Sequence, residues 1–427
     1  ILSYSSSFYI MATSKRQWSK SVKDILLINV SGHDKPGVTS AVTAVLSRFA
    51  VTVLDIGQAV IHDQLNLGIL AAVPQSSETA EMTSQVQSEL LALGMHTRFQ
   101  PISEADYQHW VEQQGKSRYI VTLLARKIDA DHLAAVTKVI SDHGLNIDKI
   151  VRLSGRVRLD ETHQLGRACV EFSVRGEPTD AVQFKSELLE LSSRYEIDIA
   201  YQEDTIFRRN RRLVVFDMDS TLIDAEVIDE LAYEAGVGEQ VAAITEAAMQ
   251  GELDFKQSFT QRVGLLKGLS ADVLQSVAER LVLNEGAEHL ISTLRKLGYK
   301  TAIVSGGFTF FGQHLQKRLG VDYVYANQLD IENGYVTGRV TGDIIDGQRK
   351  AELLRQIAAQ EGLRLEQVIA VGDGANDLPM LSIAGLGIAF RAKPLVKASA
   401  KQSISNLGLD GILYLLGYSD KDTRLLD

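Results

Sequence analysis

The chain has 427 residues, of which 45% are hydrophobic and 23% are charged. This balance is usual for soluble globular proteins and excludes a chain that is disordered throughout. At about 150 residues per domain, the length predicts two or three domains. The net charge of −10 disfavours nucleic acids and anionic membranes as partners. The single cysteine, Cys169, excludes an internal disulfide and a cysteine-based zinc site, and it fits the reducing cytoplasm, where we expect the protein.

The N-terminal segment, residues 1–24, is rich in serine and in basic residues. It lacks the continuous apolar core of a secretory signal, so we expect it to be a disordered tail. No later stretch approaches the roughly 18 apolar residues that a membrane span needs. The sequence therefore predicts no membrane partner.

The main organising feature of the N-terminal half is an internal repeat. Residues 25–56 align without gaps with residues 119–150, at a constant offset of 94, and the second copy gains four residues around positions 156–164. Each copy opens with an apolar strand, residues 25–30 and 119–124. A helix follows, and in the first copy its apolar residues fall on one stripe, namely Val38, Val42, Val45, Leu46 and Phe49.

The rest of each copy completes a small domain. In the first copy, strands over residues 51–61 and 65–73 flank a turn at residues 62–64, which predicts a hairpin. A second helix and a last strand follow, so the order is β-α-β-β-α-β, a ferredoxin-like unit. We predict two such domains, residues 25–103 and 118–204, joined by a polar linker.

The loop before the first helix, residues 32–38, reads Gly-His-Asp-Lys-Pro-Gly-Val. Together with the element order, this loop resembles the ACT domain family. The resemblance implies units that pair side by side and bind small amino acids at the pairing interface. Pro36 suits a helix start, and Gly37 lets the backbone approach a ligand whose carboxylate meets helix N–H groups. We therefore take Asp34, Pro36 and Gly37 as a candidate effector loop, with an ordinary cap and turn as the alternative.

The second copy departs from this loop motif. At the aligned positions it carries Ile128, Ala130 and Asp131. We therefore expect the second copy to act as a packing partner rather than as a ligand site. The pair of units predicts a regulatory or dimerising module in a homodimer, with L-serine or another amino acid as the effector.

A different pattern begins near residue 213, where short apolar runs alternate with helical stretches. The runs, bounded by Gly, Asp or Ser, are residues 213–216, 301–304, 323–326 and 368–371. Buried parallel strands have this character, so we predict a doubly wound parallel-sheet α/β domain over residues 213–427. Residues from about 225 to 285 have a helical pattern and predict an inserted cap. The preceding cluster of Arg208, Arg209, Arg211 and Arg212 is interpreted as a solvated linker.

The first apolar run ends in Asp217-Met218-Asp219. In open α/β sheets, reactive groups gather beyond the carboxyl ends of the strands. Two acids this close are costly unless a cation or a proton separates their states. One carboxylate would then be a nucleophile and metal ligand, and the other a protonated acid that serves the leaving group and later activates water. A strand end with acidic turn residues is the alternative.

Three further motifs follow in chain order. A second run leads into Ser305 and Gly306, whose hydroxyl and N–H groups would cradle a phosphate. Lys350 opens a helix and can neutralise a phosphate and an aspartate nucleophile together. The run at 368–371 leads into Gly-Asp-Gly-Ala-Asn-Asp at residues 372–377. Hard oxygen ligands on two neighbouring strand ends suit Mg²⁺.

These four motifs, in this order, resemble the haloacid dehalogenase superfamily of phosphotransferases, and Asp-x-Asp is typical of its phosphatase branch. In the cap, Glu226 follows Asp219 by seven residues, and Phe255 and Arg262 can share one helix face. A carboxylate suits an ammonium group and an arginine fork suits a carboxylate, which are the two ends of an α-amino acid. With these residues the chain resembles the phosphoserine phosphatase family, in its long bacterial form with two ACT domains.

The resemblance implies a role for each matched residue. Asp217 would be the nucleophile and a Mg²⁺ ligand, and Asp219 would be the general acid and base and would give its backbone carbonyl to the metal. Asp373 would complete the metal ligands, with Asp377 supporting them from behind. The substrate-binding residues would be Glu226 for the amine, Arg262 for the carboxylate, Phe255 as a shield, and Ser305, Gly306, Lys350 and Asn376 for the phosphoryl group.

The predicted reaction is the Mg²⁺-dependent hydrolysis of O-phospho-L-serine to L-serine and phosphate through an aspartyl-phosphate. It would be the last step of serine biosynthesis. Two alternatives remain open. One is the same chemistry on homoserine phosphate or a phosphoprotein, and the other is an amino-acid sensor whose phosphatase domain is vestigial.

Overall fold

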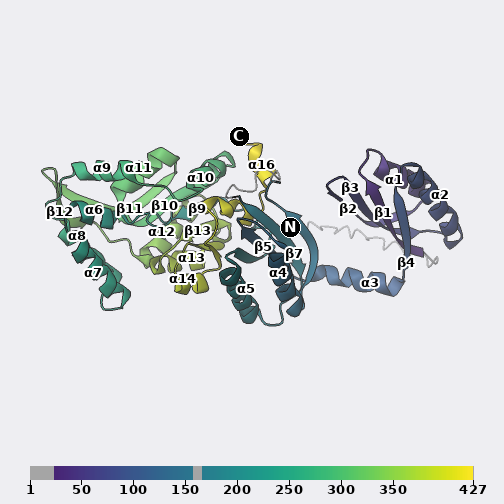
Figure 1. Ribbon diagram of the computed structural model, residues 1–427, viewed down its shortest axis with the longest axis horizontal. Helices are drawn as coiled ribbons and strands as arrows, with labels where there is room; N and C mark the ends of the chain where they lie inside the picture. The colour runs from purple at the N-terminus through teal and green to yellow at the C-terminus, as the bar shows by residue number, and fades with distance from the viewer. Residues whose placement is uncertain (1–23, 157–165, 427) are drawn as a thin grey trace, which may run out of the picture. The chain divides into compact units, whose positions relative to one another are not determined.

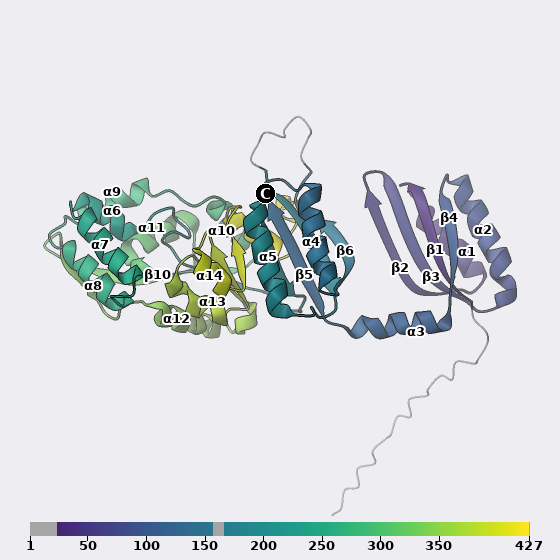
Figure 2. The ribbon, with the colours of Figure 1, turned by 60° about the horizontal axis from the view of Figure 1, so that its bottom comes forward.

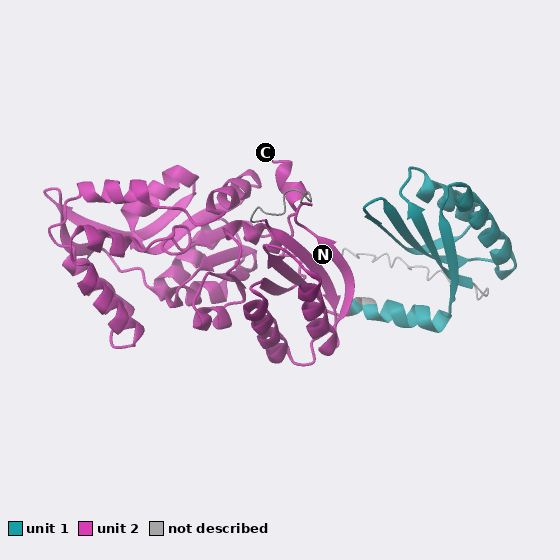
Figure 3. Ribbon diagram, in the orientation of Figure 1, with its two compact units in different colours: residues 1–115 teal, residues 116–427 magenta. Residues whose placement is uncertain are grey.

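The computed structural model describes residues 24–156 and 166–426, and Figure 1 shows its helices and strands. These residues divide between two compact units, residues 1–115 and 116–427, which Figure 3 distinguishes by colour. Apart from residue 24, the predicted tail lies outside the described residues, as does most of the insertion around positions 156–164. No helix in the described part of the chain combines the length and the apolar character needed to cross a bilayer.

The first unit contains an antiparallel sheet of four strands in the order β2-β3-β1-β4. Its elements are β1 (Asp24–His33), α1 (Val38–Arg48), β2 (Thr52–Ile61), β3 (Gln64–Val73), α2 (Thr79–Ala92) and β4 (His96–Ile102). Residues of β1 such as Leu26, Ile28 and Val30 pack with apolar residues of both helices into one core. The predicted ferredoxin-like order of elements is confirmed.

The polar segment predicted as a linker, residues 103–117, contains a helix, α3 (Glu104–Glu112). Ser103 precedes it, and the Ser103 hydroxyl accepts a hydrogen bond from the Asp106 backbone N–H at 3.0 Å. This capping, with two acidic residues in the first turn, favours a helix although residues 104–112 include no buried side chain. The polar composition alone did not reveal it.

The second unit begins with another ferredoxin-like fold, with sheet order β6-β7-β5-β8. We refer to it as the second ferredoxin-like domain. Its elements are β5 (Arg118–Ala125), α4 (Ala130–Asp142), β6 (Asn146–Arg152), β7 (Ala168–Arg175), α5 (Ala181–Tyr195) and β8 (Asp198–Glu203). One face of the sheet is covered by α4 and α5, as Figure 2 shows.

The gapless alignment of the two copies is wrong in its first strand. On the helices, Val42 and Val136 both lie in their domain cores, which agrees with the offset of 94. On the strands, that offset matches Val30 with Leu124. Val30 packs under its helices, whereas Leu124 faces the other side of its sheet. Because successive strand residues alternate between faces, the two copies must differ by a residue between strand and helix.

The rest of the second unit is an α/β domain, which we call the core domain. Its sheet has the order β12-β11-β10-β9-β13-β14-β15, with every neighbouring pair parallel except β11 and β12. The strands are β9 (Leu213–Phe216), β10 (Lys300–Phe308), β11 (Tyr323–Glu332), β12 (Tyr335–Thr341), β13 (Val368–Gly372), β14 (Leu386–Phe390) and β15 (Gln402–Ile404). The predicted doubly wound fold is confirmed.

Helices cover both faces of this sheet because alternate strand residues face opposite sides. Val214 and Phe216 pack on the side of α10 (Ala287–Lys296) and α11 (Thr309–Leu319). Leu213 and Val215 pack on the other side. The helices of that side are α12 (Gly347–Gln360), α13 (Leu378–Ile383) and α14 (Pro394–Ser399). Two short helices follow β15, namely α15 (Ile412–Leu415) and α16 (Asp420–Arg424).

Four helices lie between β9 and α10, in the region predicted as a cap. They are α6 (Val227–Glu234), α7 (Gly238–Met249), α8 (Phe255–Leu265) and α9 (Asp272–Arg280), which Figure 2 shows together at one end of the second unit. The chain enters this cap through residues 220–224 and leaves it through residues 281–286. Ile223 and Leu283 form an antiparallel bridge between these two connections.

The second ferredoxin-like domain packs against the core domain through the sheet face that carries no helices. Leu124, Cys169 and Ala200 of that face belong to the same buried cluster as the core-domain strands. Buried Asp198, at the start of β8, accepts hydrogen bonds from the backbone N–H groups of Ser405 and Asn406 at 2.8 and 2.9 Å. These contacts explain why both domains form one compact unit.

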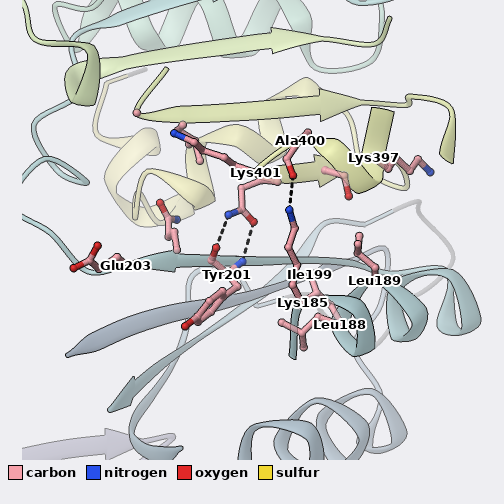
Figure 4. Close-up of a pocket in the computed structure, with 14 residues that line it drawn as sticks. Lys185, Leu188, Leu189, Ile199, Tyr201, Glu203, Lys397, Ala400 and Lys401 are labelled. Carbon is pink, nitrogen blue, oxygen red and sulfur yellow. Dashed lines mark hydrogen bonds between the residues drawn. The ribbon is translucent and has the colours of Figure 1, made fainter. Parts of the chain in front are cut away.

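The two sheets of this unit also meet edge to edge, at β8 and β15. The Gln402 side chain accepts a hydrogen bond from the Tyr201 backbone N–H at 2.8 Å and donates one to the Tyr201 carbonyl (Figure 4). Beside it, the Lys185 ammonium donates to the Ala400 carbonyl at 2.8 Å. A cavity of about 290 Å³ lies next to these contacts, lined by residues of both domains.

The interpretation of the arginine cluster as a solvated linker is wrong for two of its members. Arg208 has no exposed surface and forms an ion pair with Glu171 of β7. Arg211 is buried, and its guanidinium donates to the Gln202 side chain at 3.2 Å. Burial, with the nearby charge of Arg208, lowers the pKa of Arg211 to about 10. These arginines therefore join the second ferredoxin-like domain to the core domain.

The buried ion pair generates a prediction about stability. Glu171→Leu should lower the free energy of unfolding by about 3–5 kcal/mol, because it leaves the Arg208 charge buried without its partner. The double variant Glu171→Leu/Arg208→Met should recover most of that loss. Urea denaturation of the full chain measures both values, and a single variant as stable as the wild type would contradict the prediction.

Candidate active site

The predicted site residues converge at the carboxyl end of the core-domain sheet. Asp217 follows β9, Asp373 follows β13, and Ser305 lies in β10, the neighbour of β9 on its other side. A cavity of about 170 Å³ opens there between the sheet and the cap. Its lining includes Asp217, Asp219, Glu226, Phe255, Phe259, Arg262, Gly306, Gly307, Asp373, Gly374 and Asn376.

Lys350 holds two of the carboxylates. Its ammonium lies 2.7 Å from an oxygen of Asp217 and 2.7 Å from an oxygen of Asp377. The Lys350 side chain is completely buried. Burial alone would lower its pKa, but the two aspartates raise it above its ordinary value, so Lys350 stays charged. The Asp346 carboxylate caps the helix that presents Lys350, accepting a hydrogen bond from the Arg349 N–H at 2.8 Å.

Asp219 has a different environment from Asp217. One Asp219 oxygen accepts a hydrogen bond from the Val227 N–H at 2.8 Å, and the other accepts one from the Ser305 hydroxyl at 3.2 Å. Burial, with the nearby charge of Glu226, raises the pKa of Asp219 to about 7. A carboxyl group that titrates near neutrality can both donate and accept a proton, which general acid–base catalysis requires.

The remaining carboxylates form a group suited to a cation. Oxygens of Asp217, Asp373 and Asp377 lie within 4.8 Å of one another. Burial and neighbouring acidic groups raise the pKa of Asp217 well above its ordinary value and that of Asp373 to about 7. Three crowded carboxylates favour a bound cation, and a donor set made only of oxygens suits a hard divalent ion. Asp377, expected to support the metal ligands from behind, thus lies in the cluster itself.

The phosphate-cradle motif is packed against Asp219 and the cap. A Cβ atom placed on Gly307 would lie 2.4 Å from an Asp219 oxygen, and one on Gly306 would lie 3.1 Å from the Phe255 ring. The Ser305 hydroxyl accepts a hydrogen bond from the Gly307 N–H at 2.8 Å. Glycine at these two positions therefore lets the segment approach Asp219 and the cap without displacing either side chain.

The cap places the three predicted recognition residues at the same cavity. Glu226 accepts a hydrogen bond from the Ser220 hydroxyl at 2.7 Å. The Phe255 ring stacks on the Phe259 ring with 6.0 Å between centroids. The Arg262 Nε is buried without a hydrogen-bond partner in the described structure, and burial lowers the pKa of Arg262. An arginine held this way can accept an anionic ligand group at little further desolvation cost.

The candidate effector loop lies in the first unit. Gly37 precedes α1 with φ of 97°, a left-handed conformation that favours glycine. Pro36 and Asp34 are exposed, and the Asp34 N–H donates to the Asp63 carbonyl at 2.7 Å. The loop is thus hydrogen-bonded to the β2–β3 turn and exposed to solvent, and its ligand role remains a prediction.

Thr221 and Asn327 are among the residues of the site that were missed from the sequence. The Thr221 hydroxyl donates to Asp373 at 2.9 Å, which joins two motifs that lie far apart in the chain. Buried Asn327, on β11, donates to the Gly306 carbonyl at 2.8 Å and accepts from the Ile345 N–H at 2.9 Å. Thr221 follows the Asp-x-Asp motif and could have been noticed, whereas Asn327 stands in no motif.

Comparison with known proteins agrees with this geometry. Residues 214–382 match the family of haloacid dehalogenase-like hydrolases, and residues 24–100 match the ACT domain. The phosphoserine phosphatase of Streptomyces coelicolor is 40% identical over 402 residues, which cover 94% of each chain. That of Mycobacterium tuberculosis is 40% identical over 403 residues, covering 94% of this chain and 95% of the relative. The chain belongs to the phosphoserine phosphatase family.

Solved structures extend the comparison to the fold. A probable phosphoserine phosphatase of Vibrio cholerae is 34% identical, with a TM-score of 0.57, over 74% of this chain and 90% of that one. A HAD family hydrolase of Salmonella enterica is 33% identical, with a TM-score of 0.59, over 70% of this chain and 98% of that one. The fold therefore agrees with membership of the phosphoserine phosphatase family.

The Gly307 contact generates a prediction about catalysis. Gly307→Ala should lower phosphatase activity about 100-fold, because the added methyl group displaces the Asp219 carboxyl from its position. Gly238→Ala is the matched control, since no atom of residues 24–156 or 166–426, apart from its chain neighbours and the backbone of its own helix, lies within 4 Å of a Cβ atom at Gly238. Steady-state kinetics with circular dichroism separates loss of alignment from loss of fold. Equal activity in both variants would contradict the prediction.

Proposed function

We propose that the protein hydrolyses O-phospho-L-serine to L-serine and phosphate through an aspartyl-phosphate at Asp217, with Mg²⁺ as cofactor. The observation that carries this proposal is the Arg262 guanidinium, which faces the same cavity as Asp217 and has a buried Nε without a hydrogen-bond partner among the described residues. Relatives similar over almost the whole chain are named phosphoserine phosphatases, which supports the substrate. The reaction is the last step of serine biosynthesis, and we expect the enzyme in the cytoplasm.

The cavity offers a matching group for each part of this substrate. The Arg262 fork suits the carboxylate, and the Glu226 carboxylate suits the ammonium group. The phosphoryl group would bind beside Asp217 and Lys350, which already lie 2.7 Å apart, with Ser305, Gly306 and the Asn376 side chain around it. The Phe255 and Phe259 rings then cover the reacting atoms from the cap side and exclude water before the transfer.

In the first step, a carboxylate oxygen of Asp217 attacks the phosphorus atom as the bond from phosphorus to the serine oxygen breaks. The carboxyl proton of Asp219 goes to that serine oxygen, so L-serine leaves with a neutral side-chain hydroxyl. Lys350 keeps its charge throughout and offsets the negative charge on the transferring group. The Asp219 pKa of about 7 gives a substantial protonated fraction at neutral pH.

In the second step, a water molecule attacks the phosphorus atom and Asp219 accepts its proton, which releases phosphate and restores the Asp217 carboxylate. The cluster of Asp217, Asp373 and Asp377 would hold the Mg²⁺ ion, with the Asp219 carbonyl as a further predicted ligand. When bound, the ion supplies positive charge that lets the crowded carboxylates ionise together and neutralises the phosphoryl oxygens.

The first ferredoxin-like domain has a proposed role in regulation. The first ferredoxin-like domain would bind an amino acid, with L-serine as the first candidate, at the loop that contains Asp34, Pro36 and Gly37. The exposed helix N-terminus behind Gly37 suits a carboxylate. Pairing of two such domains from different chains would give a homodimer. The match of residues 24–100 to the ACT domain supports this part.

The decisive experiment is phosphate release from O-phospho-L-serine. Wild type with Mg²⁺ should release phosphate, and EDTA or the substitution Asp217→Asn should abolish the release, because the nucleophile and its charge balance are lost. Adding L-serine to the same assay tests the effector. No release by the metal-loaded wild type would overturn the substrate, and release by Asp217→Asn would overturn the nucleophile.

A second experiment tests recognition of the amino acid. Arg262→Ala should lower kcat/KM for O-phospho-L-serine about 100-fold, which corresponds to one charge-assisted bidentate pair. Activity on O-phosphoethanolamine, which has no carboxylate, should change by less than about threefold. Arg280→Ala is the matched control, since Arg280 forms surface ion pairs with Glu230 and Glu234 within the same cap. An equal loss on both substrates would contradict the assigned role.

A further inference from the structure

The cap is joined to the core domain by two short connections that pair with each other. The Asp224 N–H donates to the Val282 carbonyl at 3.0 Å, and the Asn284 N–H donates to the Leu222 carbonyl at 2.9 Å. Residues 220–224 begin directly after Asp219. A shift of the outgoing connection, residues 281–286, would therefore also move residues 220–224, which follow Asp219 directly.

Asn284 extends this link from the backbone to the site. It is buried, and its side-chain amide donates to the Thr221 and Ile223 carbonyls at 2.9 and 3.1 Å. The Thr221 hydroxyl in turn donates to Asp373 at 2.9 Å. Asn284 thus holds the loop that follows Asp219, and Thr221 of that loop contacts Asp373 in the carboxylate cluster.

The neighbouring residue, Glu285, is held from outside the core domain. Both terminal nitrogens of Arg126 donate to the Glu285 carboxylate, each at 2.6 Å, and form a bidentate ion pair. Arg126 lies between β5 and α4 in the second ferredoxin-like domain. On the core-domain side, Arg391 donates to Glu285 at 3.3 Å and to the Asn284 side chain at 3.1 Å. The Arg126 hydrogen bonds lower the pKa of Glu285, so the pair is ionised at neutral pH.

A second contact of the same domain holds the adjacent backbone. Arg167 forms an ion pair with Asp410. The Leu409 N–H donates to the Glu285 carbonyl at 2.7 Å, and a Cβ atom on Gly286 would lie 2.4 Å from an Asp410 oxygen. Two arginines of the second ferredoxin-like domain therefore act on the last residues of the cap connection, one at the Glu285 side chain and one beside its backbone.

We propose that Arg126 is a positioning residue for the reaction, through which the second ferredoxin-like domain fixes the outgoing connection of the cap. By holding Glu285, it keeps Asn284 and the paired connection in register, and so keeps the Asp219 loop aligned under the closing cap. This inference rests on the proposed function for its kinetic readout. Misalignment by about 1 Å at a catalytic group can cost about 100-fold in rate, so a partial loosening should give a smaller loss.

The test compares Arg126→Ala and Arg126→Lys with Arg175→Ala in the full chain. Arg175 is a matched control, because it forms an ion pair with Asp148 within the same domain and touches no cap connection in the described structure. We expect kcat for O-phospho-L-serine to fall about tenfold in Arg126→Ala, with KM changed less than about twofold. Arg126→Lys should recover part of the loss, since lysine keeps the positive charge but cannot form the bidentate pair.

Hydrogen exchange gives a readout that needs no activity. The Asp224 and Asn284 amides should exchange at least about fivefold faster in Arg126→Ala than in wild type, with no change in Arg175→Ala. Unchanged exchange at both amides, or a kcat equal to that of Arg175→Ala, would overturn the inference. An inactive wild type would overturn the proposed substrate instead, and the exchange data would still decide the role of Arg126.

Discussion

One buried ammonium group underlies the arrangement of the catalytic end of the sheet. Parallel strands bring acidic side chains from distant parts of the chain to one edge, and those charges repel one another in a setting with little water. Lys350 balances two of them at 2.7 Å each. The position of that ammonium depends on α12, which begins at a helix cap formed by Asp346. The third acid, Asp373, is held by a hydroxyl from Thr221 rather than by a charge.

The two ferredoxin-like domains show how one fold can serve in two ways. In the first, the strand residues Asn29 and Ser31 on the helix-free face are exposed and polar. In the second, Thr122 and Leu124 on the corresponding face are fully buried against the core domain. A strand that is apolar on both faces is typical of a sheet covered on both sides. The second copy thus shares a core with the domain that carries the site, whereas Asn29 and Ser31 of the first copy are exposed.

The sequence predicted the parts of the site that stand in contiguous motifs. The strand-end acids, Lys350 and the cap residues meet at one cavity because the order of motifs implies neighbouring strands. Contacts between distant single residues could not be predicted. Arg208 lies in a run of arginines that suggests a solvated segment, and only the fold shows Glu171 opposite it. Asn327 and Asn284 are likewise isolated polar residues that donate to backbone carbonyls, which no side-chain pattern reveals. The strand register of the repeat failed for a related reason, since one extra residue in a loop leaves the similarity intact but exchanges the faces of a strand.

Gln402 has a consequence for how the molecule behaves in a crowded solution. Strands at the rim of a sheet carry unpaired N–H and carbonyl groups, which can recruit strands from other molecules and start aggregation. At β8, the Gln402 amide occupies the Tyr201 N–H and carbonyl in the way that a neighbouring peptide group would. A side chain ends after one such pair, so it satisfies the rim without extending a ladder. The junction thereby removes one site for intermolecular sheet growth from the β8 rim, which would otherwise favour aggregation at high protein concentration.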